Sequence, residues 1–166
     1  DTDVQHVGHI LAELIDNDED GTADDANLLT QLQAAEFIMP MFQNEDSAAM
    51  QAFEKYYSGD GVSAVLFRFD VDPNHPGRWG YDATVEELMH TINHRGHVEL
   101  YPDAFGISPG SSRLTEAMDV ARGGQFMSVP NDYPDDAWYH YDDTTCDYGC
   151  MAIEYIYWAQ VSNMGL

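Results

Sequence analysis

The sequence predicts an α+β protein, mostly helical, that folds as a single domain with a small β-sheet. The chain has 166 residues, of which 44% are apolar, and this is enough for one packed core. Helical spacing of apolar residues recurs along most of the chain, whereas only Val62–Phe69 has the β-branched and aromatic character of a clear strand. No repeat, low-complexity segment or linker divides the sequence, so we expect one domain over residues 1–166.

The first part of the chain predicts a helix–loop–helix over residues 1–33. Val4–Ile15 places its apolar side chains on one side, as expected of a helix that packs by one face. An acidic turn follows. Asp24 or Asp25 is then placed to cap a second helix that runs to about Leu32.

The next segments predict one helix and the sheet. Glu36–Phe42 is apolar but is interrupted by Pro40, which favours an edge strand or an irregular segment. Ser47–Tyr57 has the pattern of a helix, and the glycines at 59 and 61 end it. Val62–Phe69 is the expected strand.

The second half of the chain predicts three helices. Thr84–Arg95 is helical with Gly96 as its C-terminal stop, and Ser112–Arg122 is a further helix. Pro130–Asp143 is an acidic, aromatic loop. Tyr148–Ser162 is apolar nearly all round, so we expect a buried helix.

The charge of the chain limits its partners. There are 30 acidic residues against six Lys and Arg, which gives a formal net charge of −24. Such a surface repels DNA, RNA and anionic membranes, so we expect no nucleic-acid or membrane partner. Adaptation to salty water would leave the same composition. No apolar run approaches the roughly 18 residues of a membrane span.

The two cysteines indicate the compartment. Cys146 and Cys150 are four residues apart at the start of a predicted helix, where a disulfide can join them. A disulfide favours a secreted, extracellular or periplasmic location, and binding of a metal by the two thiolates is the alternative. The chain begins at Asp1 rather than Met, from which we expect a processed form.

The acidic turn has the spacing of a calcium site. Carboxylates alternate along it, Gly21 stands at the sixth position, where a sharp turn is needed, and the seventh position can offer a main-chain oxygen. An EF-hand would close with Glu at position 12, where this chain has Asn27. The turn instead resembles the Excalibur-type calcium loop, a shortened relative of the EF-hand whose closing acid comes at position 10. The expected calcium ligands are Asp16, Asp18, Asp20, Thr22 and Asp25. A solvated acidic turn is the alternative.

A second candidate metal site lies on the Thr84–Arg95 helix, within residues 84–162. Four polar side chains fall within one arc of this helix, opposite its apolar face; they are Glu86, Glu87, His90 and His94. Imidazoles four residues apart, with a carboxylate one turn earlier, are suited to zinc or copper. The alternative is an ordinary polar helix face, in which Thr84 and Glu87 form a capping box.

Residues 86–90 resemble the HExxH motif of zinc metallopeptidases, with Glu in place of the first His. The resemblance implies that Glu86 and His90 bind the metal and that Glu87 is the base that activates a metal-bound water. In the other register, His90 and His94 are the ligands, and Thr91 then stands where the catalytic Glu should be.

A third ligand is expected from the C-terminal helix. Glu154 is the only acid there between Met151 and Ala159, and a buried carboxylate needs a cation or a partner. The resemblance to zinc peptidases also implies a Glu ligand on a later helix. Glu116 is the second choice, and an arginine is the alternative partner of Glu154.

The sequence contains three weaker candidate sites. His6, His9 and Glu13 share the polar side of the first helix, where a solvated face is the favoured interpretation. Asp70–Asn74 has alternate oxygen ligands without the glycine of a calcium loop. Tyr139–Tyr141 could border a cleft or serve packing alone.

Two functions remain open from the sequence. The first is a secreted calcium-binding protein with a zinc-dependent hydrolase site that acts on peptides or proteins. The second is a non-catalytic extracellular protein that binds copper or zinc together with calcium. A hydrolase needs an open coordination position on the metal, whereas a structural site is closed by four protein ligands.

Overall fold

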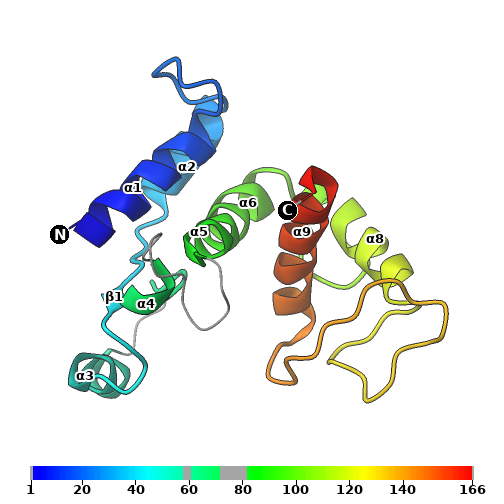
Figure 1. Ribbon diagram of the computed structural model, residues 1–166. Helices are drawn as coiled ribbons and strands as arrows, with labels where there is room; N and C mark the ends of the chain where they lie inside the picture. The colour runs from blue at the N-terminus through cyan, green and yellow to red at the C-terminus, as the bar shows by residue number, and fades with distance from the viewer. Residues whose placement is uncertain (1, 58–60, 72–81, 166) are drawn as a thin grey trace. The chain divides into compact units, whose positions relative to one another are not determined.

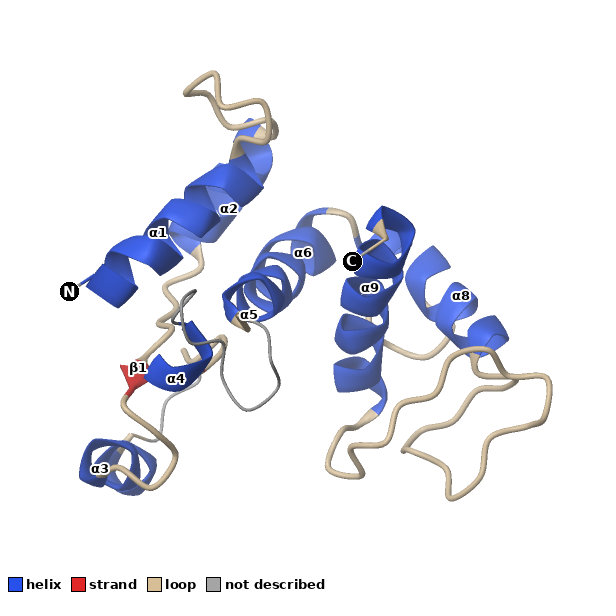
Figure 2. Ribbon diagram, viewed as in Figure 1, coloured by secondary structure: helices blue, strands red, loops and turns tan. Residues whose placement is uncertain are grey.

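The structure is a computed structural model that describes residues 2–57, 61–71 and 82–165. Helices dominate these residues (Figure 1, Figure 2). Two short parallel strands form a small sheet. The mostly helical α+β class is therefore confirmed. The chain divides into two compact units, Asp1–Arg95 (unit 1) and Gly96–Leu166 (unit 2). The expectation of a single domain stays a prediction.

Unit 1 contains a helix–loop–helix, a two-stranded sheet and three further helices. Its elements are α1 (Thr2–Ile15), α2 (Ala26–Ala34), β1 (Met41–Phe42), α3 (Ala48–Tyr56), β2 (Leu66–Phe67), α4 (Arg68–Val71) and α5 (Thr84–Ile92). Side-chain oxygens cap α2 and α3 at their N-termini. Asp25 accepts the N–H groups of Asn27 and Leu28, and Ser47 accepts that of Met50.

The sheet is shorter than the sequence predicts. β1 and β2 pair in parallel, with Met41 opposite Leu66, and an isolated bridge joins Ile38 to Val62. The expected strand Val62–Phe69 is thus wrong at its end, because Arg68 already begins α4. The partner segment explains part of this, since Pro40 has no N–H to give to a longer ladder.

Contacts between α1 and the later helices hold unit 1 together. α1 contacts both α4 and α5. His6 Nε2 lies 2.7 Å from Asp82 Oδ2, just before α5, and Arg68 Nε lies 2.8 Å from Asp3 Oδ2. Leu88, which is 1% exposed, places the apolar face of α5 in the core.

The helix that begins with α5 does not stop at Gly96. It widens into a π-helical turn, η1 (Asn93–His97), and continues as α6 (Val98–Leu100). The predicted stop was wrong because a glycine ends a helix by adopting a positive φ, which Gly123 and Gly165 have and Gly96 does not.

Unit 2 is built on the packing of two helices. After α6 it contains α7 (Pro102–Phe105), α8 (Arg113–Ala121) and α9 (Tyr148–Met164), and α8 and α9 lie side by side (Figure 1). Their shared core comprises Leu114, Met118, Ala121, Cys146, Tyr148, Met151, Ala152, Tyr155 and Ile156. The last turn of α9 is exposed, so the prediction of a helix buried throughout holds only for its first three turns.

Caps and a disulfide fix the start of α8 and α9. Ser112 and Thr115 form a capping box at α8, and Asp147 accepts the N–H of Cys150 at α9. Cys146 and Cys150 are joined by a disulfide with their Cα atoms 5.4 Å apart, as predicted. None of the helices in the described ranges is both long and apolar enough to cross a membrane.

A fully buried arginine links α8 to α9. Arg122 is 0% exposed, and its guanidinium lies 3.1 Å from Asp119 Oδ1 and 3.2 Å from the carbonyl oxygen of Phe126. Its Nη1 also lies 3.0 Å from Met151 Sδ on α9. The Tyr148 hydroxyl donates to the second Asp119 oxygen at 2.9 Å. The buried charge is therefore paired and hydrogen-bonded, which is the condition for a charge to be tolerated in a core.

We expect Asp119→Ala to lower the free energy of unfolding by about 3 kcal/mol, because it leaves the buried Arg122 charge without its carboxylate. Urea denaturation at neutral pH measures this. Asp142→Ala, an exposed change in the same unit, should cost at most about 0.5 kcal/mol. Equal effects of the two substitutions would show that the ion pair contributes nothing special.

Candidate metal sites

The loop between α1 and α2 folds around the side chain of Asp16. Its Oδ1 accepts the N–H of Asp20 at 3.1 Å, and its Oδ2 accepts the N–H of Gly21 at 2.8 Å. Gly21 has a φ of 86°, a conformation that L side chains rarely adopt. The glycine at the sixth position therefore makes the turn that the sequence pattern requires.

Three carboxylates meet in this loop. Asp16, Asp18 and Asp24 each offer an oxygen, and these oxygens all lie within 4.8 Å of one another. Asp24 Oδ2 accepts the side-chain N–H of Asn17 at 2.8 Å and its backbone N–H at 3.0 Å. These two hydrogen bonds lower the pKa of Asp24, so its carboxylate stays ionised to more acidic pH. A cluster of oxygen ligands with this charge is suited to a hard cation such as calcium.

The side chain of Asp25 binds backbone N–H groups at the start of α2. Its Oδ1 accepts the N–H groups of Asn27 at 2.9 Å and Leu28 at 3.2 Å, and it thereby caps α2. Its neighbour Asp24 joins Asp16 and Asp18 instead. Asp20 Oδ1 accepts the N–H of Thr22 at 2.8 Å. Calcium ligation by Asp20, Thr22 and Asp25 stays a prediction.

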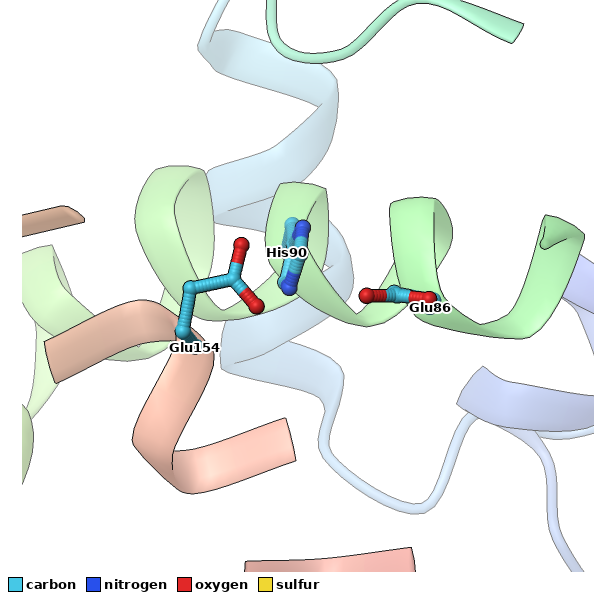
Figure 3. Close-up of side chains that lie close together, drawn as sticks. All are labelled: Glu86, His90 and Glu154. Carbon is cyan, nitrogen blue, oxygen red and sulfur yellow. The ribbon is translucent and has the colours of Figure 1, made fainter. Parts of the chain in front are cut away.

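The second group of ligand atoms involves α5. Figure 3 shows Glu86 and His90 on this helix and Glu154 on α9. All three side chains are half-buried. Glu86 and His90 are one helical turn apart on α5, so this helix offers a carboxylate and an imidazole together, a combination that zinc accepts. Ligation by Glu154, which belongs to unit 2, stays a prediction.

Glu87 lies beside His90 on the same helix. Its Oε2 is 3.8 Å from His90 Nδ1, and the two side chains are 30% and 14% exposed. Nδ1 is therefore the imidazole nitrogen on the side of Glu87. The capping box that was the alternative role of Glu87 is not formed, since Ala83 is the N-cap and Asp82 accepts the N–H of Thr84 at 2.9 Å.

His94 and Glu116 do not belong to this group. His94 is exposed and lies within the π-helical turn, where the spacing of 100° per residue used for the sequence projection no longer holds. Glu116 is exposed in the first turn of α8. His97, next to the expected helix stop, stacks on Phe105 with ring centroids 5.0 Å apart.

Glu154 lies beside two tyrosines of unit 2. Tyr141 donates a hydrogen bond to its carboxylate. Burial and the charge of Glu154 raise the pKa values of Tyr141 and Tyr139 above the usual range of a phenol, so both hydroxyls stay protonated donors at neutral pH. Of the arginines considered as partners of Glu154, Arg68 and Arg122 pair with Asp3 and Asp119.

The weaker candidates have other roles. His6 bonds to Asp82, and His9 Nε2 lies 3.1 Å from Glu13 Oε1 on the exposed side of α1. Neither pair belongs to a group of three ligand atoms within the described part of the chain. The candidate segment Asp70–Asn74 lies outside the described residues from position 72 onward.

Sequence reasoning missed the place of Asp24 in the loop and the contact of Tyr141 with Glu154. The first was within reach, because Asp24 occupies position 9 of the loop counted from Asp16, a position that contributes to calcium binding in EF-hands. No sequence signal links Tyr141 to Glu154, which is 13 residues away across a loop and a helix start.

Comparisons with known proteins add no relative. No protein-family model matches the chain, and the searches of curated proteins and of solved structures produced no match.

The cap role of Asp25 can be separated from metal binding. In buffer with a chelator, Asp25→Ala should lower the free energy of unfolding by about 1 kcal/mol, because two N–H groups of α2 lose their acceptor. Asp25→Asn is the matched control, since Asn caps as well as Asp. Equal stability of the two variants would contradict the cap.

Proposed function

We propose that this protein binds calcium in the α1–α2 loop and zinc through Glu86 and His90 of α5, and that the zinc site is hydrolytic. The observation that carries the proposal is that Asp16, Asp18 and Asp24 offer ligand atoms within 4.8 Å of one another, whereas Glu86 and His90 lie one turn apart on one helix. The loop offers oxygens alone, and α5 offers an imidazole as well. The difference in ligand type is the reason to assign the two groups to different metals.

The calcium assignment is supported by the turn around Asp16. Backbone N–H groups already hold both oxygens of this side chain, so the loop loses little further freedom when a cation binds. A bound divalent cation would also reduce the self-repulsion of a chain with a net charge of −24.

The hydrolytic assignment is supported by the EExxH resemblance, which implies a third zinc ligand on a later helix, Glu154. Three protein ligands would leave one position of a tetrahedral zinc ion for water, as in catalytic sites, where zinc lowers the pKa of the bound water to about 7. Glu87 follows Glu86 directly and is the candidate base. The EExxH resemblance makes peptides or proteins the substrate class.

The position of Glu87 beside His90 Nδ1 also favours a second role. A carboxylate at the second nitrogen of a ligand imidazole orients the ring and strengthens the metal bond without taking part in catalysis. In that case the chain would be a non-catalytic zinc- or copper-binding protein. Loss of Glu87 would remove catalysis in the first role and weaken metal binding in the second. A substitution at Glu87 therefore separates the two roles.

The Cys146–Cys150 disulfide supports an oxidising compartment, either extracellular or periplasmic. Calcium is abundant enough outside the cytosol for a loop of modest affinity to be filled. The acidic surface makes nucleic acids and anionic membranes unsuitable partners.

Calcium should stabilise the fold by mass action. At a calcium concentration 100 times the Kd, we expect the free energy of unfolding to rise by about 2.7 kcal/mol. Asp18→Asn should abolish most of this gain, because it removes one of the three clustered carboxylates. Glu19→Gln, which removes the same charge from the same loop outside the cluster, should keep it.

Thermal melts of the three proteins with calcium and with chelator measure this gain. If calcium leaves the melting temperature of the wild type unchanged, the loop is only an acidic turn. Equal responses of Asp18→Asn and Glu19→Gln would assign the gain to net charge rather than to the cluster.

Zinc content and peptide hydrolysis should separate the roles on α5. His90→Ala should lose bound zinc and activity together, whereas His94→Ala, the exposed histidine of the same helix, should keep both. Glu87→Gln should retain zinc and lose about 10²–10⁴-fold in rate if Glu87 is the base.

The assay is cleavage of an unbiased peptide library, with zinc measured by mass spectrometry in parallel. If Glu87→Gln instead weakens zinc binding about 10- to 100-fold, Glu87 orients His90 and the hydrolytic role has lost its base. Full zinc binding by His90→Ala would refute the site.

A further inference from the structure

The disulfide at the start of α9 has one buried end and one exposed end. Cys146 is 4% exposed and belongs to the core that α8 and α9 share, whereas Cys150, in the first turn of α9, is exposed. Exchange of a disulfide begins when a thiolate attacks one of its two sulfurs, and access decides which of them is attacked. Cys150 is therefore the sulfur that a thiol from solution can reach.

The start of α9 is held by hydrogen bonds that do not involve sulfur. Asp147 Oδ1 accepts the N–H of Cys150 at 2.9 Å. Before the helix, the N–H of Cys146 donates to the carbonyl oxygen of Asp143 at 3.1 Å. Asp147 also forms an isolated antiparallel bridge with Ser128. The turn thus keeps these restraints when the two sulfurs are separated.

The disulfide itself restrains the unfolded chain little. It joins residues four apart, and in the chain-entropy account the stabilisation by a disulfide falls as the closed loop becomes shorter. A reduced Cys146 would remain in the core as a small apolar side chain, which protein interiors accept. Reduction is therefore compatible with the fold of unit 2.

Carboxylates flank the disulfide along the chain. Asp142, Asp143 and Asp147 are all exposed. Asp143 Oδ1 accepts the backbone N–H of Thr145 at 2.9 Å and its hydroxyl at 2.7 Å, and these hydrogen bonds lower the pKa of Asp143. The Asp143 carboxylate therefore stays ionised to more acidic pH. A turn with this charge repels anionic reactants and attracts cationic ones.

We propose that the Cys146–Cys150 disulfide is a thiol–disulfide exchange site, which neutral or cationic thiols enter at Cys150. The incoming thiolate attacks Cys150 Sγ, the S–S bond breaks, and its electron pair leaves with Cys146 Sγ, which takes up a proton. A second thiolate attacks the incoming sulfur of the mixed disulfide and releases Cys150 as a thiolate, which is protonated in turn. The protein gains two electrons and two protons, and the two thiols are oxidised to their disulfide.

The experiment opens the disulfide in the full chain without denaturant and with a chelator present. The probes are cysteamine, 2-mercaptoethanol and mercaptoethanesulfonate, which are cationic, neutral and anionic, and the opened bond is measured by alkylation and mass spectrometry. We expect each thiol to open the bond, the mixed disulfide to map to Cys150, and the circular dichroism spectrum to stay unchanged. A bond that opens only in denaturant, or whose opening unfolds the helices, would be a structural staple and would overturn the proposal.

Salt tests the selection by charge. Salt screens the carboxylates, so the ratio of the cysteamine rate to the mercaptoethanesulfonate rate should fall about 10-fold between low and high salt. The rate of the neutral thiol should not change. A ratio that is independent of salt would overturn the selection of neutral and cationic thiols.

Matched variants test the entry point and the local charge. In Cys146→Ala, the Cys150 thiol should react readily with N-ethylmaleimide in the folded protein. In Cys150→Ala, the buried Cys146 thiol should react about 100-fold more slowly, because it requires local opening. Asp143→Asn should raise the rate of mercaptoethanesulfonate about 2- to 5-fold, whereas Glu116→Gln, which removes the same charge from α8, should leave it unchanged.

Equal maleimide rates of the two cysteine variants would contradict entry at Cys150. Equal effects of Asp143→Asn and Glu116→Gln would contradict a local role of the acidic turn. Should Cys146→Ala fail to fold, the position of the mixed disulfide in the wild type decides the same question, and a mixed disulfide on Cys146 would overturn the proposal.

Discussion

The buried guanidinium of Arg122 is the constraint on which unit 2 depends. A charge with no exposure to water must be compensated from several directions, and α8, α9 and the loop between them each contribute to this. Asp119 supplies the opposite charge, Phe126 a carbonyl oxygen, and Met151 and Tyr148 of α9 a polarisable and an aromatic surface. Burial and the hydrogen bond to Asp119 raise the pKa of the Tyr148 phenol to about 12, so it remains a donor to that carboxylate. The long loop therefore has a fixed start, although little of it forms regular structure.

The elements that the sequence predicted well are those whose determinants lie within a few residues. Asp25, Ser47 and Ser112 begin helices because a side-chain oxygen accepts an N–H two or three residues later, and such spacing can be read directly. The predicted length of the strand Val62–Phe69 and the predicted helix stop at Gly96 were wrong for another reason. The length of a strand depends on its partner, here a segment interrupted by Pro40, and glycine ends a helix only if the chain beyond it turns away.

The candidate sites likewise include features that are local in the sequence and features that depend on packing. The spacing of carboxylates and glycine in the α1–α2 loop is local, and the clustering of Asp16 with Asp18 matches it, whereas the choice between Asp24 and Asp25 depended on which of the two was needed as a cap. On α5, Glu86 and His90 are one helical turn apart and could be paired from sequence. The role of His94 depended on a change of helical pitch that no propensity scale indicates. Tyr141 lay beyond reach, because its place is set by Tyr133 and by the packing of the loop.

The π-helical turn makes the orientation of the side chains that follow it depend on one extra residue. Such a turn accommodates one residue more than an α-helical turn, so deleting one residue from Asn93–His97 could restore an uninterrupted α-helix. Every later side chain of that helix would then be rotated by about 100° around its axis. His97 would lose its stacking on Phe105, and Val98–Leu100 would present a different face. The extra residue thus acts as a register adjustment, which sets the orientation of Val98–Leu100 around the helix axis.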